Sequence, residues 1–202
     1  MITIIDYGVG NLFSLSSSFS YIGADVMISG NPADILRADK LILPGVGAFA
    51  DAAKKLSETG LGKILCDEAS RGKDIMGICL GMQLLFEESR EYGSHRGLGL
   101  IPGVVEYIGD YTDTSLKIPQ IGWNALDIKR PSRLLSKIKN GDFVYFVHSY
   151  FAKTPEEFIT STAEYGTAIT ATVEQGNIMG CQFHPEKSGE VGLNILRAFC
   201  EV

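Results

Sequence analysis

Two short segments, far apart in the chain, carry side chains that can perform covalent catalysis. Residues 77–81 read Gly-Ile-Cys-Leu-Gly around Cys79, after an apolar pair and before a helix-like run over residues 82–86. Residues 183–186 read Phe-His-Pro-Glu at the end of another apolar run. A nucleophile, a base and a group that orients the base make the site of a covalent hydrolase or transferase.

The segment around Cys79 has the spacing of a sharp turn from a strand into a helix. Such a turn pushes the central side chain above the sheet edge and crowds the residues two before and two after it, so glycine suits positions 77 and 81. A cysteine at the helix N-terminus lies among free N–H groups at the positive end of the helix dipole, which favours the reactive thiolate. The structural alternative is a small buried cysteine in a tight turn.

The second segment supplies a base and a partner for it. In an extended chain, residues i and i+2 point to the same side, so His184 and Glu186 can project together. Pro185 removes a backbone donor, which suits the end of a strand. Alone, the segment is equally compatible with a strand-end histidine and a solvated glutamate. Its combination with the Cys79 turn favours a catalytic triad of Cys79, His184 and Glu186.

Length and charge limit the class of protein. The chain has 202 residues, a net charge of −6 and scattered basic residues. We expect one domain over residues 1–202 and no nucleic-acid partner, since nucleic acid requires a basic face. The apolar runs are too short to span a membrane, and the first strand begins at Ile2 without a signal peptide. A cytoplasmic location without a membrane partner is therefore expected.

The four cysteines are widely spaced and show no Cys-x-x-Cys pattern. We therefore expect neither a disulfide framework nor a metal site. Cys66, Cys181 and Cys200 are interpreted as small buried hydrophobic residues.

Short apolar strands alternate with amphipathic helices in the first half. Strands are predicted over residues 2–5, 24–28, 40–43 and 74–78, and helices over residues 11–21, 48–58 and 61–71. This alternation predicts an α/β fold with a mostly parallel central sheet and helices on both faces. The second half adds strands over residues 125–129, 143–151 and 158–163, an antiparallel hairpin of residues 167–174 and 177–183, and a helix over residues 189–200.

Ligands of open α/β sheets bind beyond the carboxyl ends of the strands. Three loops should meet there, formed by residues 6–11, residues 44–47 and the turn around Cys79. The spacing of Gly8 and Gly10 suggests a dinucleotide site, but Phe13 occupies the third glycine position and this interpretation is discounted.

Six segments together resemble the class I glutamine amidotransferases over essentially the whole chain. They cover residues 6–11, 43–49, 77–83, 121–124, 145–150 and 182–188. The segments around Cys79 and His184 are general to that class. Pro-Gly-Val-Gly, Gly-Trp-Asn and Val-His-Ser-Tyr are similar to its glutaminase subunits of histidine biosynthesis. The implied fold is the flavodoxin-like α/β fold of the class.

The resemblance implies glutamine as the substrate and no cofactor. Cys79 attacks the side-chain amide, His184 moves the protons and Glu186 orients the imidazole, after which water hydrolyses the glutamyl thioester. The implied oxyanion and glutamine contacts are Gly45, Val46, Gly47, Leu80, Gln83, Ser149 and Tyr150.

Two backbone groups are the expected oxyanion donors. One is the N–H of Leu80. The resemblance implies that the other comes from Val46 after a peptide rearrangement, which Gly45 and Gly47 make easy because glycine tolerates positive φ. Gln83 lies one helical turn after Cys79 on the same face, although an ordinary polar helix residue is the alternative.

Because free ammonia is lost to protonation in water, such a glutaminase should pass ammonia directly to a partner. The implied partner is a (β/α)8-barrel synthase that forms a heterodimer with this chain. Asn11, Trp123, Tyr145 and Lys187 are similar to positions at or near that interface. Packing of Trp123 in a loop and solvation of Lys187 are the structural alternatives.

Three other functions share parts of this pattern. A glutaminase subunit of anthranilate or aminodeoxychorismate synthase differs only in its partner, and a stand-alone γ-glutamyl thiol hydrolase needs none. A non-enzymatic redox sensor uses the cysteine alone, and the complete set of Cys79, His184 and Glu186 argues against it. His148, expected in mid-strand, is interpreted as a packed histidine, and His95, in an apparent loop, receives no role.

Overall fold

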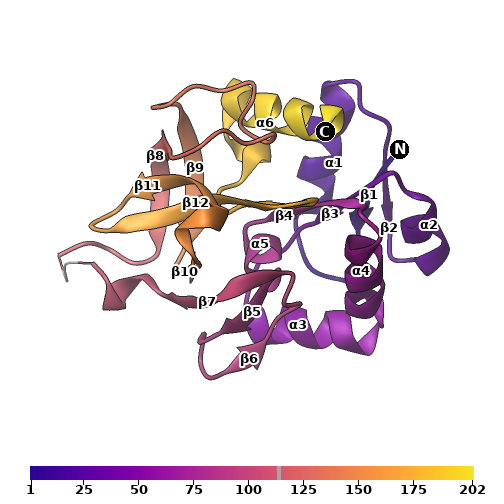
Figure 1. Cartoon of the computed structure of the whole chain (residues 1–202), viewed down its shortest axis with the longest axis horizontal. Helices are drawn as coiled ribbons and strands as arrows, with labels where there is room; N and C mark the ends of the chain where they lie inside the picture. Colours follow the sequence, from indigo (N-terminus) through magenta and orange to yellow (C-terminus); the bar gives the residue numbers. More distant parts are fainter. Residues whose placement is uncertain (113–114) are drawn as a thin grey trace.

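A nine-stranded sheet runs through the middle of the computed structural model, which describes residues 1–112 and 115–202 (Figure 1). Its parallel half has the order β2 (Val26–Ser29), β1 (Ile2–Ile5), β3 (Lys40–Leu43), β4 (Asp74–Ile78) and β13 (Ile178–Cys181). Its antiparallel half continues through β12 (Ala168–Gln175), β11 (Ile159–Glu164), β8 (Gln120–Ile128) and β9 (Phe143–His148). The predicted α/β fold with antiparallel additions from the C-terminal half is confirmed.

Helices cover both faces of this sheet (Figure 1). On one face, α1 (Leu12–Tyr21) and α6 (Gly189–Glu201) bury Phe19 and Phe199 against the strands. On the other face lie α3 (Phe49–Glu58), α4 (Leu61–Ser70) and the five-residue α5 (Leu80–Leu84). In α3 the buried residues Phe49, Ala52 and Leu56 recur at helical spacing, and this apolar stripe turns the helix toward the core.

A second sheet beside α5 is absent from the sequence-based prediction. Its order is β10 (Tyr150–Lys153), β7 (Ile101–Tyr107), β5 (Phe86–Ser89) and β6 (His95–Arg96). The expectation of a continuous helix over residues 82–86 is wrong, since α5 ends at Leu84 and β5 begins at Phe86. Strands this short carry too little periodicity to be recognised locally.

The remaining elements include one unpredicted helix. α2 (Pro32–Arg37) begins with proline at its first position, and Asn31 caps it by accepting from the N–H of Ala33 at 3.0 Å. The predicted hairpin is confirmed as β12 and β13, with Gln175 opposite Ile178. Short 3₁₀ segments occupy Ile108–Asp110, Glu156–Phe158 and Pro185–Lys187.

Two strand boundaries differ from the prediction in ways that affect the site. β8 begins at Gln120, so Trp123 lies within a strand and not in a loop. The predicted strand over residues 143–151 is interrupted at Ser149. His148 is consequently the last residue of β9, and Tyr150 begins β10 in the other sheet.

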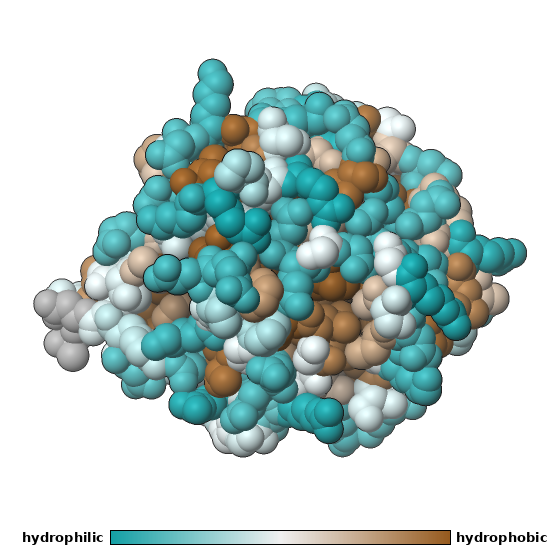
Figure 2. Space-filling model, viewed as in Figure 1, coloured by the Kyte–Doolittle hydropathy of each residue, from teal (hydrophilic) through white to brown (hydrophobic). Residues whose placement is uncertain are grey.

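The molecular surface in the view of Figure 2 is mainly hydrophilic, with an apolar patch where α3, α4 and α5 come together. Among the helices of residues 1–112 and 115–202, none combines the length and the apolar character needed to cross a membrane.

Candidate active site

Cys79 stands on a strained turn at the carboxyl end of β4, in the middle of the large sheet. Its φ of 54° and ψ of −113° are unusual for a residue other than glycine. Its N–H donates to the carbonyl of Cys181 at 2.8 Å. A Cβ on residue 77 would lie 2.6 Å from the Gly81 oxygen, and a Cβ on residue 81 would lie 1.8 Å from the Leu43 oxygen. Backbone crowding therefore requires both glycines, as their spacing predicts.

His184 and Glu186 are paired just beyond β13. Nδ1 of His184 lies 2.8 Å from Oε1 of Glu186, and the two side chains are only 5% and 3% exposed. The pairing was expected from an extended chain, but that reason is wrong, because Pro185–Lys187 form a 3₁₀ turn. The hydroxyl of Ser188 donates to the carbonyl of His184 at 2.6 Å and holds this turn in place.

The charge of His184 follows from its neighbours. Burial lowers the pKa of His184, but hydrogen bonding and charge interactions with Cys79 and Glu186 outweigh burial and raise it to about 10. The imidazole is therefore protonated at neutral pH. A carboxylate can only accept, so Nδ1 donates to Glu186 and Nε2 is the nitrogen that remains for Cys79.

Glu186→Gln is expected to lower the pKa of His184, because the substitution removes a carboxylate that raises it. A pKa raised by folding stabilises the native state fully below the unfolded value of about 6.5, and this contribution is lost as pH rises toward about 10. The free energy of unfolding should therefore decline between these pH values more steeply in the unaltered chain than in the variant. Histidine NMR titration and denaturant unfolding measure the two effects, and identical titration of His184 in both proteins would contradict the pairing.

A cavity of about 300 Å³ opens beside Cys79. Its lining consists of Val46, Gly47, Cys79, Leu80, Gln83, Glu91, Pro119, Val147, His148, Ser149, Tyr150 and His184. The structure thus brings the predicted nucleophile and base together with all predicted oxyanion and glutamine contacts except Gly45.

Gly45, in the loop of residues 44–47, is not among the cavity residues and packs against the turn that carries Cys79. A Cβ on residue 45 would lie 2.9 Å from the N atom of Gly81, so close packing against the turn requires this glycine. Of the two glycines in this loop, Gly45 and Gly47, only Gly47 has a positive φ, of 94°. The hydroxyl of Tyr7 donates to the carbonyl of Pro44 at 2.7 Å, which joins the loop of residues 6–11 to this one as expected.

Gln83 is tied into a buried polar chain. Its Nε2 donates to the carbonyl of Tyr150 and to Oε1 of Gln182, both at 2.9 Å. Nε2 of Gln182 in turn donates to Sγ of Cys79 at 3.7 Å. Gln182 lies in one of the segments that carry the family resemblance, yet no role was predicted for it. The available signal was its position two residues before His184, directly after the apolar run that forms β13.

Glu91 lines the cavity and also had no role predicted from the sequence. It follows β5, and its Oε2 accepts from the backbone N–H of Phe49 at 2.6 Å. This contact joins two segments distant in sequence, and no local pattern around Glu91 predicts it. Glu91 is the only acidic side chain among the described residues that line the cavity.

His148 lines the same cavity but has a different chemical state from His184. Burial lowers the pKa of His148 to about 4; the Tyr150 carbonyl opposes this effect and the charge of His184 adds to it. Because a carbonyl can only accept, Nδ1 of His148 carries the proton in its 2.8 Å contact with Tyr150. His148 is thus packed, as the sequence suggested, and the structure adds that its imidazole is neutral at neutral pH. His95 lies in β6, not in a loop, and is not among the cavity residues.

The residues predicted for a partner interface form one group, apart from Asn11. The rings of Trp123 and Tyr145 are 6.0 Å apart at directly opposed positions of β8 and β9, and Nζ of Lys187 lies 5.9 Å from the Tyr145 ring centroid. Trp123 is 52% exposed, so half of its surface is available to another molecule. Asn11 caps α1 by accepting from the N–H of Ser14 at 3.4 Å.

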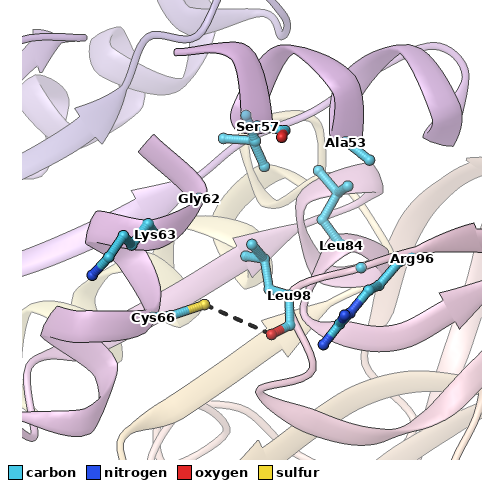
Figure 3. A pocket seen from close by; sticks show the side chains of 10 residues that line it. Ala53, Ser57, Gly62, Lys63, Cys66, Leu84, Arg96 and Leu98 are labelled. Carbon is cyan, nitrogen blue, oxygen red and sulfur yellow. Dashed lines mark hydrogen bonds between the residues drawn. The ribbon is translucent and has the colours of Figure 1, made fainter. Parts of the chain in front are cut away.

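A separate hollow lies between α3, α4 and the loop after β6, below the patch seen in Figure 2 (Figure 3). Leu56, Leu84 and Leu98 line it, and Sγ of Cys66 contacts the Leu98 carbonyl at 3.7 Å. It contains none of the triad residues, so we assign the chemistry to the cavity at Cys79. Cys66 and Cys200 are only partly buried, and the expectation of a buried hydrophobic cysteine is confirmed for Cys181 alone.

Comparison with known proteins agrees with this architecture. The family model of the class-I glutamine amidotransferases matches residues 3–201. The chain therefore belongs to that family and is a glutaminase-type enzyme. Imidazole glycerol phosphate synthase subunit HisH of Listeria monocytogenes is 48% identical, with 100% of this chain and 96% of the relative covered. The protein of the same name from Bacillus licheniformis is 50% identical, with 98% and 95% covered.

Solved structures extend the likeness to more distant proteins. A crystal structure of a glutamine amidotransferase has a TM-score of 0.77 at 17% identity, covering 99% of this chain and 97% of that one. The structure of PurLQS from Thermotoga maritima has a TM-score of 0.76 at 19% identity, with the same two coverages of 99% and 97%. At these identities the two structures support the fold alone.

Proposed function

We propose that this chain hydrolyses L-glutamine through a Cys79 thioester and is the glutaminase subunit of an imidazole glycerol phosphate synthase. The observation that carries the proposal is the cavity in which Cys79 and His184 meet the predicted glutamine contacts. Relatives named as subunits of that synthase, 48% and 50% identical, support the choice of pathway. The ammonia passes to a (β/α)8-barrel partner that makes imidazole glycerol phosphate and an aminoimidazole carboxamide ribonucleotide.

The reaction begins with addition of the Cys79 sulfur to the carboxamide carbon of glutamine. His184, protonated at neutral pH, gives its Nε2 proton to the amide nitrogen as the C–N bond breaks, and ammonia leaves. His184 then accepts a proton from water, which attacks the thioester carbon. The C–S bond breaks, glutamate is released and the sulfur of Cys79 is restored. Glu186 holds the imidazole in the required orientation throughout.

The negative charge that develops on the carboxamide oxygen needs N–H donors. Leu80 is the first residue of α5, a position whose N–H has no acceptor within the helix. We assign this N–H as one donor, and a backbone N–H of the Val46–Gly47 segment as the other. Val46 is 44% exposed beside the cavity, and the left-handed Gly47 next to it allows the peptide to rotate.

Glu91 supplies recognition of the substrate as an amino acid. Its carboxylate lies in the cavity wall and is complementary to the α-ammonium group of glutamine. The backbone contact with Phe49 holds Glu91 in place before the substrate arrives.

Glu91→Gln is expected to raise the KM for glutamine by about 10- to 100-fold, the usual worth of a hydrogen bond to a charged group, with little change in kcat. The variant keeps an oxygen that can accept from Phe49, so the loss isolates the charge. Steady-state kinetics measure the effect, and Glu157→Gln at an exposed position is the matched control. An unchanged KM in Glu91→Gln would rule out this role.

The proposed partner surface consists of Trp123, Tyr145 and Lys187. The backbone carbonyl of Tyr145 accepts from the backbone N–H of His184 at 3.0 Å, and the backbone N–H of Tyr145 donates to the hydroxyl of Ser188 at 3.0 Å. A partner that docks on this surface therefore acts directly on the turn that carries His184 and Glu186. This arrangement supports a partner-activated enzyme over a stand-alone hydrolase.

The test is a glutaminase assay of the chain with and without candidate partners. With a (β/α)8-barrel synthase and its ribonucleotide ligand, glutamate and imidazole glycerol phosphate should form in equal amounts. Stimulation only by an anthranilate or aminodeoxychorismate synthase subunit would assign the chain to another pathway. Full turnover without any partner would favour the γ-glutamyl hydrolase.

A further inference from the structure

Gln182 is a fully buried polar side chain in direct contact with the nucleophile. It is 0% exposed, and its backbone N–H donates to the carbonyl of Ala171 at 2.8 Å. The two ends of its side-chain amide contact Gln83 at 2.9 Å and Sγ of Cys79 at 3.7 Å. An amide is costly to bury without partners, and an apolar side chain would fill the same space without this requirement.

The orientation of the Gln182 amide follows from the chain of contacts. The Tyr150 carbonyl can only accept, so the amide nitrogen of Gln83 must face it. The second hydrogen on that nitrogen points to Gln182, which must therefore present its oxygen to Gln83. Only the NH₂ group of Gln182 is then left to face Cys79.

The end of this hydrogen-bond series at Tyr150 is fixed as well. The same Tyr150 carbonyl accepts from Nδ1 of His148 at 2.8 Å, so two donors from different strands and helices converge on one oxygen. Gln83 cannot turn its amide over without placing its oxygen against the Tyr150 carbonyl. A reversal of Gln182 would in turn set its NH₂ group against that of Gln83. The direction of the N–H bond toward the Cys79 sulfur is consequently built into the fold.

We propose that Gln182 acts on the nucleophile by donating an N–H to the sulfur of Cys79, which holds the sulfur in position and stabilises its negative charge. This inference rests on the proposed function of Cys79. A donor to a charged acceptor is stronger than one to a neutral acceptor, so the contact favours the thiolate over the thiol. Because the Gln182 side chain is neutral, it does this without competing with His184 for Glu186.

The test compares three substitutions in the full chain with its barrel partner. Gln182→Met keeps the length of the side chain but removes the N–H, whereas Gln182→Glu keeps the shape and sets a carboxylate beside the sulfur. Gln175→Met is the matched control, because Gln175 lies at the opposite end of the β12–β13 pair. The readouts are the pH profile of Cys79 alkylation by iodoacetamide and the kcat and KM for glutamine, with thermal unfolding measured on every variant.

Gln182→Met should slow Cys79 alkylation at neutral pH by about 10- to 100-fold and move the profile to higher pH. The kcat of Gln182→Met should fall in parallel, with little change in its KM. Gln182→Glu should show a larger fall in both the alkylation rate and kcat. Gln175→Met should match the unaltered chain in both. An unchanged alkylation profile in either Gln182 variant would overturn the proposal. If Gln182→Met does not fold, the result for Gln182→Glu decides the test. If glutaminase activity does not depend on Cys79 at all, the proposed function fails instead.

Discussion

Replacing Cys79 with serine or alanine is expected to reduce glutamine hydrolysis by about 10⁴-fold or more, because removal of a covalent nucleophile abolishes its reaction path. The synthase complex should still use ammonia supplied in solution, since the acceptor chemistry belongs to the partner. Glutamate release and ammonia-dependent product formation measure the two activities separately. Serine and alanine should both preserve the fold, because neither side chain is larger than that of the buried Cys79.

Alkylation provides the control for this substitution. Burial raises the pKa of the Cys66, Cys181 and Cys200 thiols, so each should react slowly with iodoacetamide or a glutamine-like chloroketone. Cys79 should therefore be labelled first, with activity lost in parallel. Labelling of another cysteine that accompanies the loss of activity would show that the nucleophile lies elsewhere.

The barrel partner with its acceptor ligand is expected to raise glutaminase turnover by about 10²–10³, the usual contribution of one oxyanion donor. The physical reason is that a donor in the Val46–Gly47 segment must be aligned, and that the turn bearing His184 is bonded to Tyr145 on the proposed docking surface. Turnover of the isolated chain and of the complex, each with saturating glutamine, gives the ratio.

Substitutions on the docking surface separate activation from folding. Trp123→Ala and Lys187→Ala should weaken binding of the partner or the ratio of stimulation more than they lower the unfolding temperature. Tyr21→Ala, at an exposed position of α1, serves as a surface control of similar chemistry. A stimulation ratio near one with the unaltered chain would contradict activation by the partner.

The parallel half of the sheet was predictable because its strands are short apolar runs that alternate with helical segments. β3 and β4, for example, are buried on both faces and read as continuous hydrophobic sequence. The second sheet was not predictable, since β5 and β7 contain Glu87, Pro102 and Gly103 and gain their stability from pairing with each other and with β10. Trp123 was misplaced in a loop because its glycine and asparagine neighbours are typical of turns.

The candidate site, like the fold, was predictable from the sequence only in part. Cys79, His184 and Glu186 each belong to a local pattern, so their types and spacing were sufficient to select them. The position of Glu186 was expected for the wrong reason, because the 3₁₀ turn depends on Ser188. The contacts of Gln182 with Gln83 and of Glu91 with Phe49 join residues far apart in the chain, and only the folded structure reveals these contacts.

Rapid-quench mass spectrometry of the complex during turnover tests the covalent mechanism most directly. The chain is mixed with glutamine and the barrel partner, quenched in acid to preserve thioesters, and digested for peptide mapping. A glutamyl adduct on the peptide that contains Cys79, which appears and decays at rates consistent with turnover, is the predicted result. Steady glutamine hydrolysis with no adduct at Cys79, or with an adduct on Cys66, Cys181 or Cys200, would contradict the account.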